Sequence, residues 1–222
     1  QAELDRVWVE TVASFPMYAT RLLKIQTVEG ELKSFIFNEV QLLLEKIEQH
    51  IKESGRLHRV VILKARREGV STYTTAKFFH KVANKKNRYA TLVTHEPEAT
   101  DFIFKMQKRY YDHLPKDYQP AIKFNNTKIL EFNERQGSGG LDSAIRVGTA
   151  GKADFGSGQL INYLHVSELT KWPAATQKDL LTSLLQCVPA EVDTAIVFES
   201  TARGIGGEFY DRFRTSRFQY EI

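Results

Sequence analysis

The sequence has only one cysteine, Cys187, so an intrachain disulfide and a cysteine-based zinc site are both excluded. Its apolar runs are far shorter than a bilayer crossing requires. The charged N-terminal stretch QAELDRVWVE lacks the apolar core of a signal peptide. Internal repeats and low-complexity tracts are absent as well. We therefore expect a soluble, intracellular protein in a reducing compartment.

The excess of positive charge is small, with a formal net charge of +4. That balance permits contact with nucleic acid but does not demonstrate it, because an ordinary soluble protein can carry the same excess. The chain has 222 residues, of which 42% are hydrophobic, enough for one large domain or at most two small ones.

The apolar pattern predicts a helical N-terminal region at residues 4–23 that Pro16 limits or kinks, a hairpin at residues 24–37 and an amphipathic helix at residues 40–51. Strands and helices then alternate. Strands are expected at residues 59–65, 88–96, 127–133, 144–150, 161–168 and 194–201, and helices at 71–84, 98–115 and 176–188. This order predicts an α/β fold with a mainly parallel central sheet flanked by helices. Ligands of such sheets bind at the carboxyl ends of the strands.

The segment KARREGVST follows the first of these strands and has the spacing of the phosphate-binding loop G-x-x-x-x-G-K-[ST], known as Walker A. Lys64 replaces the first glycine, and Val70 replaces the usual lysine. Gly69 and Ser71 keep their places, so a glycine turn and a helix N-terminus can still bind phosphate. The candidate nucleotide-binding residues here are Lys64, Arg66, Arg67, Glu68, Gly69, Val70, Ser71 and Thr72.

The cationic residues of this loop are candidates to replace the absent lysine. We expect Lys64 to bind the β- and γ-phosphates, Arg66 to sense the γ-phosphate and Ser71 to ligate Mg²⁺. The alternative is a basic turn whose charges are only solvated.

Two later strands end in residues suited to ATP hydrolysis. Ser167 and Glu168 end the first, and Glu168 can polarise the attacking water while Ser167 holds a metal-bound water. Ser200 and Thr201 end the second, and their hydroxyls can contact the γ-phosphate or that water. The alternative for Glu168 is a solvated glutamate at a strand end, and the alternative for Ser200 and Thr201 is a plain loop without a catalytic role. We expect His165 to be a hydrogen-bonded histidine of the core rather than a metal ligand.

Asn38 and Gln41, upstream of the loop, are candidates to recognise adenine, because an amide offers both a donor and an acceptor. Taken by itself, Asn38 is better explained as a helix cap.

The whole set of motifs resembles the ATPase domain of a tailed-bacteriophage terminase large subunit. The resemblance covers nearly the whole chain and depends on KARREGVST, LHVSELTKWP, GTAG at 148–151 and ESTARG. One branch of that family similarly lacks the usual lysine and has Ser-Glu as its acidic pair. The resemblance implies a P-loop NTPase fold of the ASCE type in a single domain, with residues 1–56 as extension and adenine motif and 57–222 as core.

The resemblance also implies a function. It implies a Mg²⁺-dependent ATPase that drives double-stranded DNA into a procapsid in the host cytoplasm. The implied partners are the portal protein, the small terminase subunit and further copies of the chain in a ring, usually a pentamer. Within this family the ATPase domain is followed by a nuclease domain, which we do not expect in these 222 residues.

One position departs from the family pattern. Many relatives carry an arginine eleven residues before the catalytic glutamate, and Ser157 occupies that position here. Either Arg146 or Arg203 acts on a neighbouring subunit instead, or this chain is altered or weakly active. Two other functions stay open: another P-loop DNA translocase or helicase, and a nucleic-acid-binding module with a decayed nucleotide site.

Overall fold

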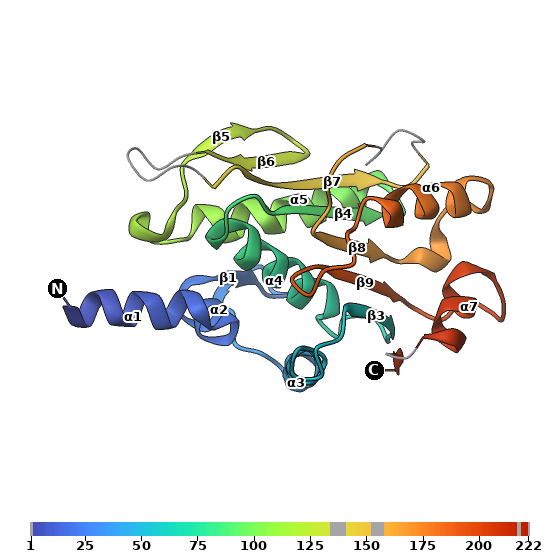
Figure 1. The fold of residues 1–222 in the computed structure, drawn as a ribbon, viewed down its shortest axis with the longest axis horizontal. Helices are drawn as coiled ribbons and strands as arrows, with labels where there is room; N and C mark the ends of the chain where they lie inside the picture. The colour runs from blue at the N-terminus through green and yellow to red at the C-terminus, as the bar shows by residue number, and fades with distance from the viewer. Residues whose placement is uncertain (1, 134–140, 152–157, 217–218, 222) are drawn as a thin grey trace.

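The computed structural model describes residues 2–133, 141–151, 158–216 and 219–221. Within this part of the chain, eight strands form one central sheet (Figure 1). They are β3 (His58–Leu63), β4 (Tyr89–Thr94), β5 (Ile122–Asn125), β6 (Ile129–Phe132), β7 (Ser143–Thr149), β8 (Tyr163–Ser167), β9 (Ala195–Ser200) and β10 (Gln219–Glu221).

The order of the strands across this sheet is β10-β3-β9-β8-β4-β7-β6-β5. The strands from β10 to β7 in that order run parallel, and β6 and β5 continue the sheet antiparallel. The mainly parallel sheet expected from the sequence is therefore confirmed.

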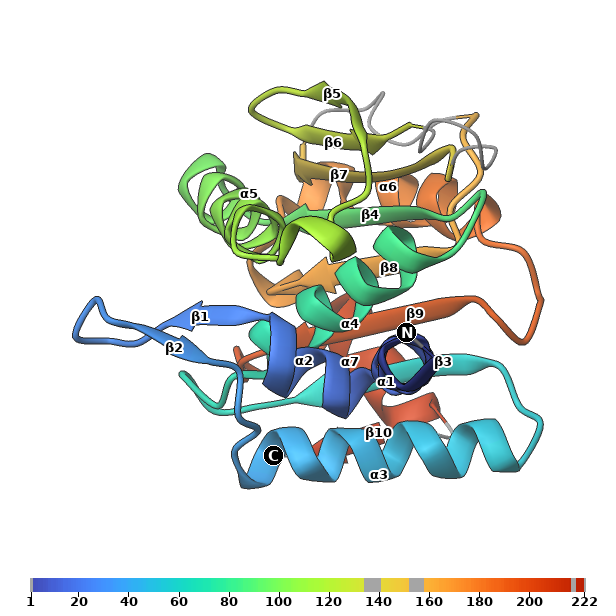
Figure 2. The same cartoon turned by 90° about the vertical axis from the view of Figure 1, so that its left-hand side faces the viewer.

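Helices cover both faces of the sheet (Figure 2). One side carries α2 (Phe15–Leu22), α3 (Glu39–Glu53), α4 (Val70–Asn84) and α5 (Pro97–Asp112), and the other carries α6 (Ala174–Gln186) and α7 (Gly207–Thr215). Strand β3 shows why there are two cores: Val60 and Ile62 pack on the α4 side, while Val61 between them packs on the α6 side. Among the described residues, no helix is both long and apolar enough to cross a membrane.

The N-terminal extension begins with α1 (Ala2–Ala13), which projects from one end of the molecule (Figure 1). Ser14 separates α1 from α2, and Pro16 lies in the first turn of α2, where its missing N–H removes no helical hydrogen bond. The predicted hairpin follows as β1 (Lys24–Gln26) and β2 (Leu32–Ser34), paired antiparallel. Both sequence predictions for this region are confirmed.

Three elements were not predicted: β5, α7 and β10. Three of the four residues of β5 are exposed, so its sequence lacks the buried alternation that indicates a strand. β10 has three residues and forms only by pairing with β3, from Gln219 opposite Val61 to Glu221 opposite Leu63. Such pairing depends on the folded sheet and leaves little pattern in the local sequence.

Candidate active site

The segment 64–69 connects β3 to α4 at the carboxyl end of the sheet. Gly69 directly precedes α4 with a φ of 77°, and Arg67 has a φ of 68°, so the chain enters the left-handed region twice within this loop. A Cβ on Gly69 would lie 2.5 Å from Gln41 Nε2, so a residue with a side chain would have to displace Gln41 and also adopt a positive φ. The loop therefore has the glycine turn and the helix N-terminus that bind phosphate in proteins.

Two amide side chains of the extension hold this loop. Asn38 caps α3: its Oδ1 accepts from the Gln41 N–H at 2.9 Å, and Gln41 Oε1 accepts from the Asn38 N–H at 3.0 Å. Their amide nitrogens donate to loop carbonyls, Asn38 Nδ2 to Glu68 at 3.2 Å and Gln41 Nε2 to Gly69 at 3.0 Å. The capping alternative for Asn38 is thus present, and adenine recognition by the pair stays a prediction.

The parallel register brings the ends of β3, β9 and β8 together. Ser167 of β8 lies opposite Glu199 of β9, and β9 pairs with β3 on its other side. Beyond the strand ends, the Lys64 N–H donates to the Ser200 carbonyl at 3.0 Å. The Glu168 N–H donates to the Glu199 carbonyl at 2.8 Å. The phosphate loop and the acidic strand therefore meet across β9.

Glu168 lies at the centre of this meeting point. Its φ of 52° is unusual for a residue with a Cβ and turns the chain into a short 3₁₀ helix at Leu169–Lys171. Lys64 Nζ is 3.2 Å from Glu168 Oε1, and the Thr201 hydroxyl donates to Oε2 at 3.0 Å. Burial raises the pKa of Glu168, but Lys64 and the Thr201 hydroxyl outweigh burial, so the pKa lies below its ordinary value. The carboxylate is ionised at neutral pH.

A second carboxylate, Glu199, lies beside it and was overlooked in the sequence as a site residue. Its side chain is completely buried. Ser71 Oγ and Ser167 Oγ both donate to its Oε1 at 2.7 Å, and Lys64 Nζ is 3.1 Å from its Oε2. The only sequence signal was an acidic residue in an otherwise apolar strand, VFES, next to the residues that did attract attention.

The other predicted residues lie around this centre. Arg66 and Arg67 are exposed at the tip of the loop, whereas Val70 is buried at the start of α4. Ser200 is hydrogen-bonded to Thr170, with 2.7 Å between the two hydroxyl oxygens. The carbonyl oxygen of Thr72 accepts from the Tyr110 hydroxyl at 3.3 Å, inside α4.

The candidate arginines lie in different places. Arg146 is in β7, and Arg203 is exposed in the segment after β9. Ser157 lies outside the described residues. His165 is buried as predicted, and its Nε2 lies 3.3 Å from Glu199 Oε1, but within the described part of the chain neither ring nitrogen makes a hydrogen bond, so that half of the prediction is wrong. Burial lowers its pKa to about 3, so the ring is neutral at pH 7.

A divalent cation fits the oxygen atoms gathered here. In the part of the chain that the structure describes, no three His, Cys, Asp or Glu side chains are grouped to hold a metal ion by themselves. Mg²⁺ needs no such group, because it is bound by one or two carboxylates together with nucleotide phosphates. Glu199 Oε2 is buried without a hydrogen-bond partner in the described residues, beside the hydroxyls of Ser71 and Ser167. These three side chains would hold Mg²⁺ together with the phosphates of a nucleotide.

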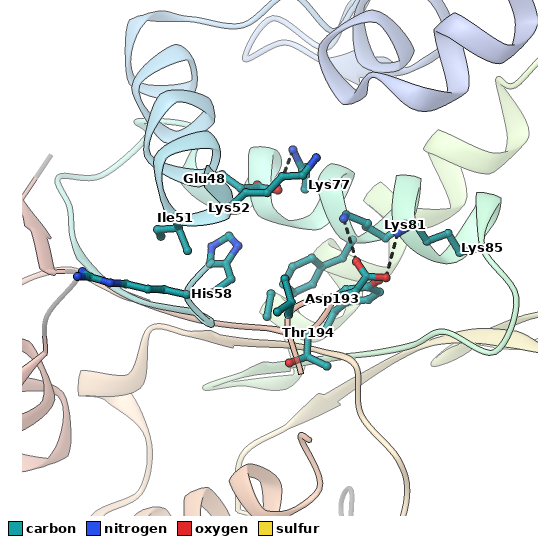
Figure 3. Close-up of a pocket in the computed structure, with 14 residues that line it drawn as sticks. Glu48, Ile51, Lys52, His58, Lys77, Lys81, Lys85, Asp193 and Thr194 are labelled. Atoms are coloured by element: carbon teal, nitrogen blue, oxygen red, sulfur yellow. Dashed lines mark hydrogen bonds and ion pairs between the residues drawn. The ribbon is translucent and has the colours of Figure 1, made fainter. Parts of the chain in front are cut away.

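A cavity of about 300 Å³ opens at the opposite end of the sheet from the loop 64–69, at the first residues of β3, β8 and β9 (Figure 3). Lysines from and just after α4 point into it, but acidic groups neutralise them. Asp193 is 3.2 Å from Lys81 and 2.9 Å from Lys85, and Glu48 is 3.0 Å from Lys77. The cavity is therefore lined by an internal ion network that is separate from the phosphate loop.

No protein-family model and no curated protein sequence matches the chain. Solved structures do match. The ATPase domain of the Thermus phage P74-26 large terminase superposes with a TM-score of 0.62 at 15% identity, covering 81% of this chain and 70% of that chain. The HK97 bacteriophage large terminase superposes with a TM-score of 0.71 at 10% identity, covering 95% of this chain and 43% of that chain.

The fold is that of a phage large-terminase ATPase domain. The expected P-loop NTPase fold is thereby confirmed. In this fold, β9 lies between β3, which leads into the loop 64–69, and β8, which ends at Ser167.

Proposed function

We infer that the chain is the ATPase domain of a phage large terminase and hydrolyses ATP to move double-stranded DNA into a procapsid. The observation that carries this conclusion is the position of Lys64. Its ammonium lies 3.2 Å from the Glu168 carboxylate and 3.1 Å from the Glu199 carboxylate, next to the glycine turn of the loop. A positive charge is therefore present in the phosphate site although Val70 occupies the usual lysine position.

The residues divide the work of hydrolysis. The N–H groups around Gly69 and at the start of α4 bind phosphate oxygens, and Lys64 supplies the full positive charge. Glu168 accepts a proton from, and orients, the attacking water. Mg²⁺, when bound, neutralises charge that develops on the phosphates. Arg66, exposed at the loop tip, approaches the γ-phosphate from the solvent side.

Lys64 also links nucleotide binding to catalysis. Its contact with Glu168 Oε1 competes with any contact to phosphate, because one ammonium has to serve both. A triphosphate draws Lys64 away and releases Glu168 for the attacking water. Thr201, which donates to Glu168 Oε2 at 3.0 Å, and the neighbouring Ser200 then carry the change from the catalytic carboxylate into β9.

The partners follow from the terminase assignment. We expect double-stranded DNA, the portal protein, the small terminase subunit and a homo-oligomeric ring, a pentamer, at the procapsid in the host cytoplasm. The chain spans 43% of the HK97 large terminase, so DNA packaging is proposed for the whole motor to which this domain contributes. A neighbouring subunit's arginine completes each site, with Arg146 and Arg203 as the candidates.

The test is substitution of the catalytic carboxylate. Glu168→Gln should reduce Mg²⁺-dependent ATP hydrolysis by about 100-fold or more, since a general base contributes about 10²–10⁴-fold. ATP affinity, measured by calorimetry, should stay close to that of the parent because the loop is untouched. Glu98→Gln, at an exposed position in α5, is the matched control and should change neither quantity.

Two results would contradict the proposal. Hydrolysis by Glu168→Gln at the parent rate would remove Glu168 from catalysis. A parent chain that binds no ATP, with or without Mg²⁺, would overturn the ATPase function itself. Slow turnover by a monomer would not, because the arginine of a neighbouring subunit is then missing, and for this reason binding is measured separately.

A further inference from the structure

We propose that Glu199 supplies the carboxylate of the Mg²⁺ site, in place of the acidic residue that Ser167 lacks. The proposal rests on the proposed ATPase function and deepens it. In P-loop ATPases a carboxylate at the end of the acidic strand holds the metal shell, and the residue at that place here is a neutral serine. The required negative charge is one strand away, on β9.

Geometry places Glu199 where that carboxylate has to act. It is the register partner of Ser167 on the neighbouring strand. Neighbouring strands lie about 4.8 Å apart, and a glutamate side chain is one methylene longer than aspartate, so it extends further toward the shared site. Both hydroxyls assigned to the metal, Ser71 and Ser167, already donate to Glu199 Oε1 at 2.7 Å.

The burial of Glu199 argues for a cation as its partner. Taking an ionised carboxylate fully out of water is costly unless opposite charge compensates for it. Two serine hydroxyls could donate equally well to a neutral acceptor, so they do not by themselves require a carboxylate at this position. Oε2 has no hydrogen-bond partner within the described residues, and Lys64 Nζ at 3.1 Å is the cation that faces it.

Once a nucleotide binds, Lys64 alone cannot compensate all the negative charges that surround it. Lys64 then faces two carboxylates, Glu168 and Glu199, and a triphosphate, and Lys171 Nζ, 3.3 Å from Glu168 Oε2, compensates only Glu168. When Lys64 engages the phosphates, the buried Glu199 needs a second positive charge. Mg²⁺ enters with the nucleotide and takes oxygen ligands, and the Ser71 and Ser167 hydroxyls are then free to turn toward it.

The competing explanation is that Glu199 only anchors the two serines. The test therefore measures metal binding rather than activity, with Mn²⁺ in place of Mg²⁺ and a non-hydrolysable ATP analogue. Electron paramagnetic resonance gives the Mn²⁺ affinity of the protein–nucleotide complex, and calorimetry in EDTA gives the affinity for the analogue alone. Parent, Glu199→Gln, and the double variant Ser167→Asp with Glu199→Gln are compared.

We expect Glu199→Gln to bind Mn²⁺ about 10–100-fold more weakly, the loss typical when a group that supports a metal is removed. Its affinity for the metal-free analogue should fall little, which also shows that the loop is folded. The double variant moves the carboxylate back to the end of β8 and should recover most of the Mn²⁺ affinity. A role limited to anchoring Ser167 predicts no recovery, because Ser167 is then absent.

Parent-like Mn²⁺ affinity in Glu199→Gln would overturn the proposal, and so would a double variant no better than the single one. If Glu199→Gln does not fold, the double variant and Glu199→Asp, which keeps the charge, provide the same comparison. Both should then bind Mn²⁺, and failure of both folded variants to do so would contradict the proposal. A parent that binds no nucleotide would instead overturn the ATPase function, so the two failures are distinguishable.

Discussion

Lys64 and Glu168 are separated by 104 positions in the sequence, yet Lys64 Nζ lies 3.2 Å from Glu168 Oε1. Both side chains are largely buried, with exposed fractions of 8% and 14%. An ion pair shielded in this way is far less screened by salt than one at the surface. The two strand ends are thus linked by the groups assigned to bind phosphate and to activate water.

The first prediction concerns Lys64. Lys64→Met should weaken ATP binding in EDTA by about 10-fold or more, because a hydrogen bond to a charged group contributes about 1.5–3 kcal/mol. Arg67→Ala changes a second candidate residue of the same loop, whose side chain is exposed, and for this comparison variant we expect a much smaller loss of ATP affinity. Calorimetric titration measures both. Equal losses in the two variants would show that the loop attracts phosphate only through its general positive charge.

The second prediction concerns the glycine turn. Gly69→Ala should destabilise the fold more than Gly55→Ala, by about 1 kcal/mol, the typical contribution of one hydrogen bond. Both positions have positive φ, 77° and 64°, so the backbone penalty is similar. Only at Gly69 would the new Cβ displace Gln41, whereas nothing lies within 4 Å at Gly55. Urea unfolding compares the two; equal losses would mean that the Gln41 contact contributes nothing.

The third prediction concerns the ion network around Asp193, in the cavity at the opposite end of the sheet from the loop 64–69. Burial raises the pKa of Asp193, but Lys81 and Lys85 outweigh it and lower the pKa to about 2, from an ordinary 3.8. A carboxylate whose pKa is lower in the folded state than in the unfolded state stabilises the fold at any pH above its unfolded-state pKa. For Asp193 this contribution disappears as the pH falls from about 4 to about 2. Asp193→Asn should therefore destabilise the protein at pH 7 by about 1 kcal/mol, allowing for solvent screening.

The difference in unfolding free energy between the parent and Asp193→Asn should narrow as the pH falls below about 4. Urea titrations at a series of pH values measure it. Asp179→Asn, on the exposed side of α6, serves as the control and should show almost no difference at any pH. If the difference in unfolding free energy between the parent and Asp193→Asn stayed constant at pH values down to about 2, Asp193 would act through packing rather than charge.

Local patterns predicted most of the fold because most elements bury an apolar face at regular spacing. The loop from Lys64 to Ser71 was found in the same way, from its spacing and its single glycine turn. Glu199 was not, since its role depends on the order of strands in the sheet. Nothing local in TAIVFEST indicates that this strand inserts between β3 and β8, beside Ser167.

Edge elements were missed for a related reason. β10 is held by pairing with β3, and β5 lies at the opposite edge with most of its residues exposed. Neither has an apolar periodicity that separates it from a loop. Asn38 and Gln41 were named from the sequence as candidates to recognise adenine, which stays a prediction. Their hydrogen bonds to Glu68 and Gly69 were not foreseen, because they require the packing of α3 against the loop, which no spacing in the sequence indicates.

Those amide bonds have a mechanical consequence. The first turn of α3 and the carbonyl oxygens of the loop are fastened together, so α3 acts as a lever on the peptide groups that face the nucleotide. A neighbouring molecule that tilts α3 would alter how long the nucleotide stays bound without touching it. If the domains assemble in the ring proposed above, the timing of product release would pass from one member to the next through residues that take no part in the chemistry.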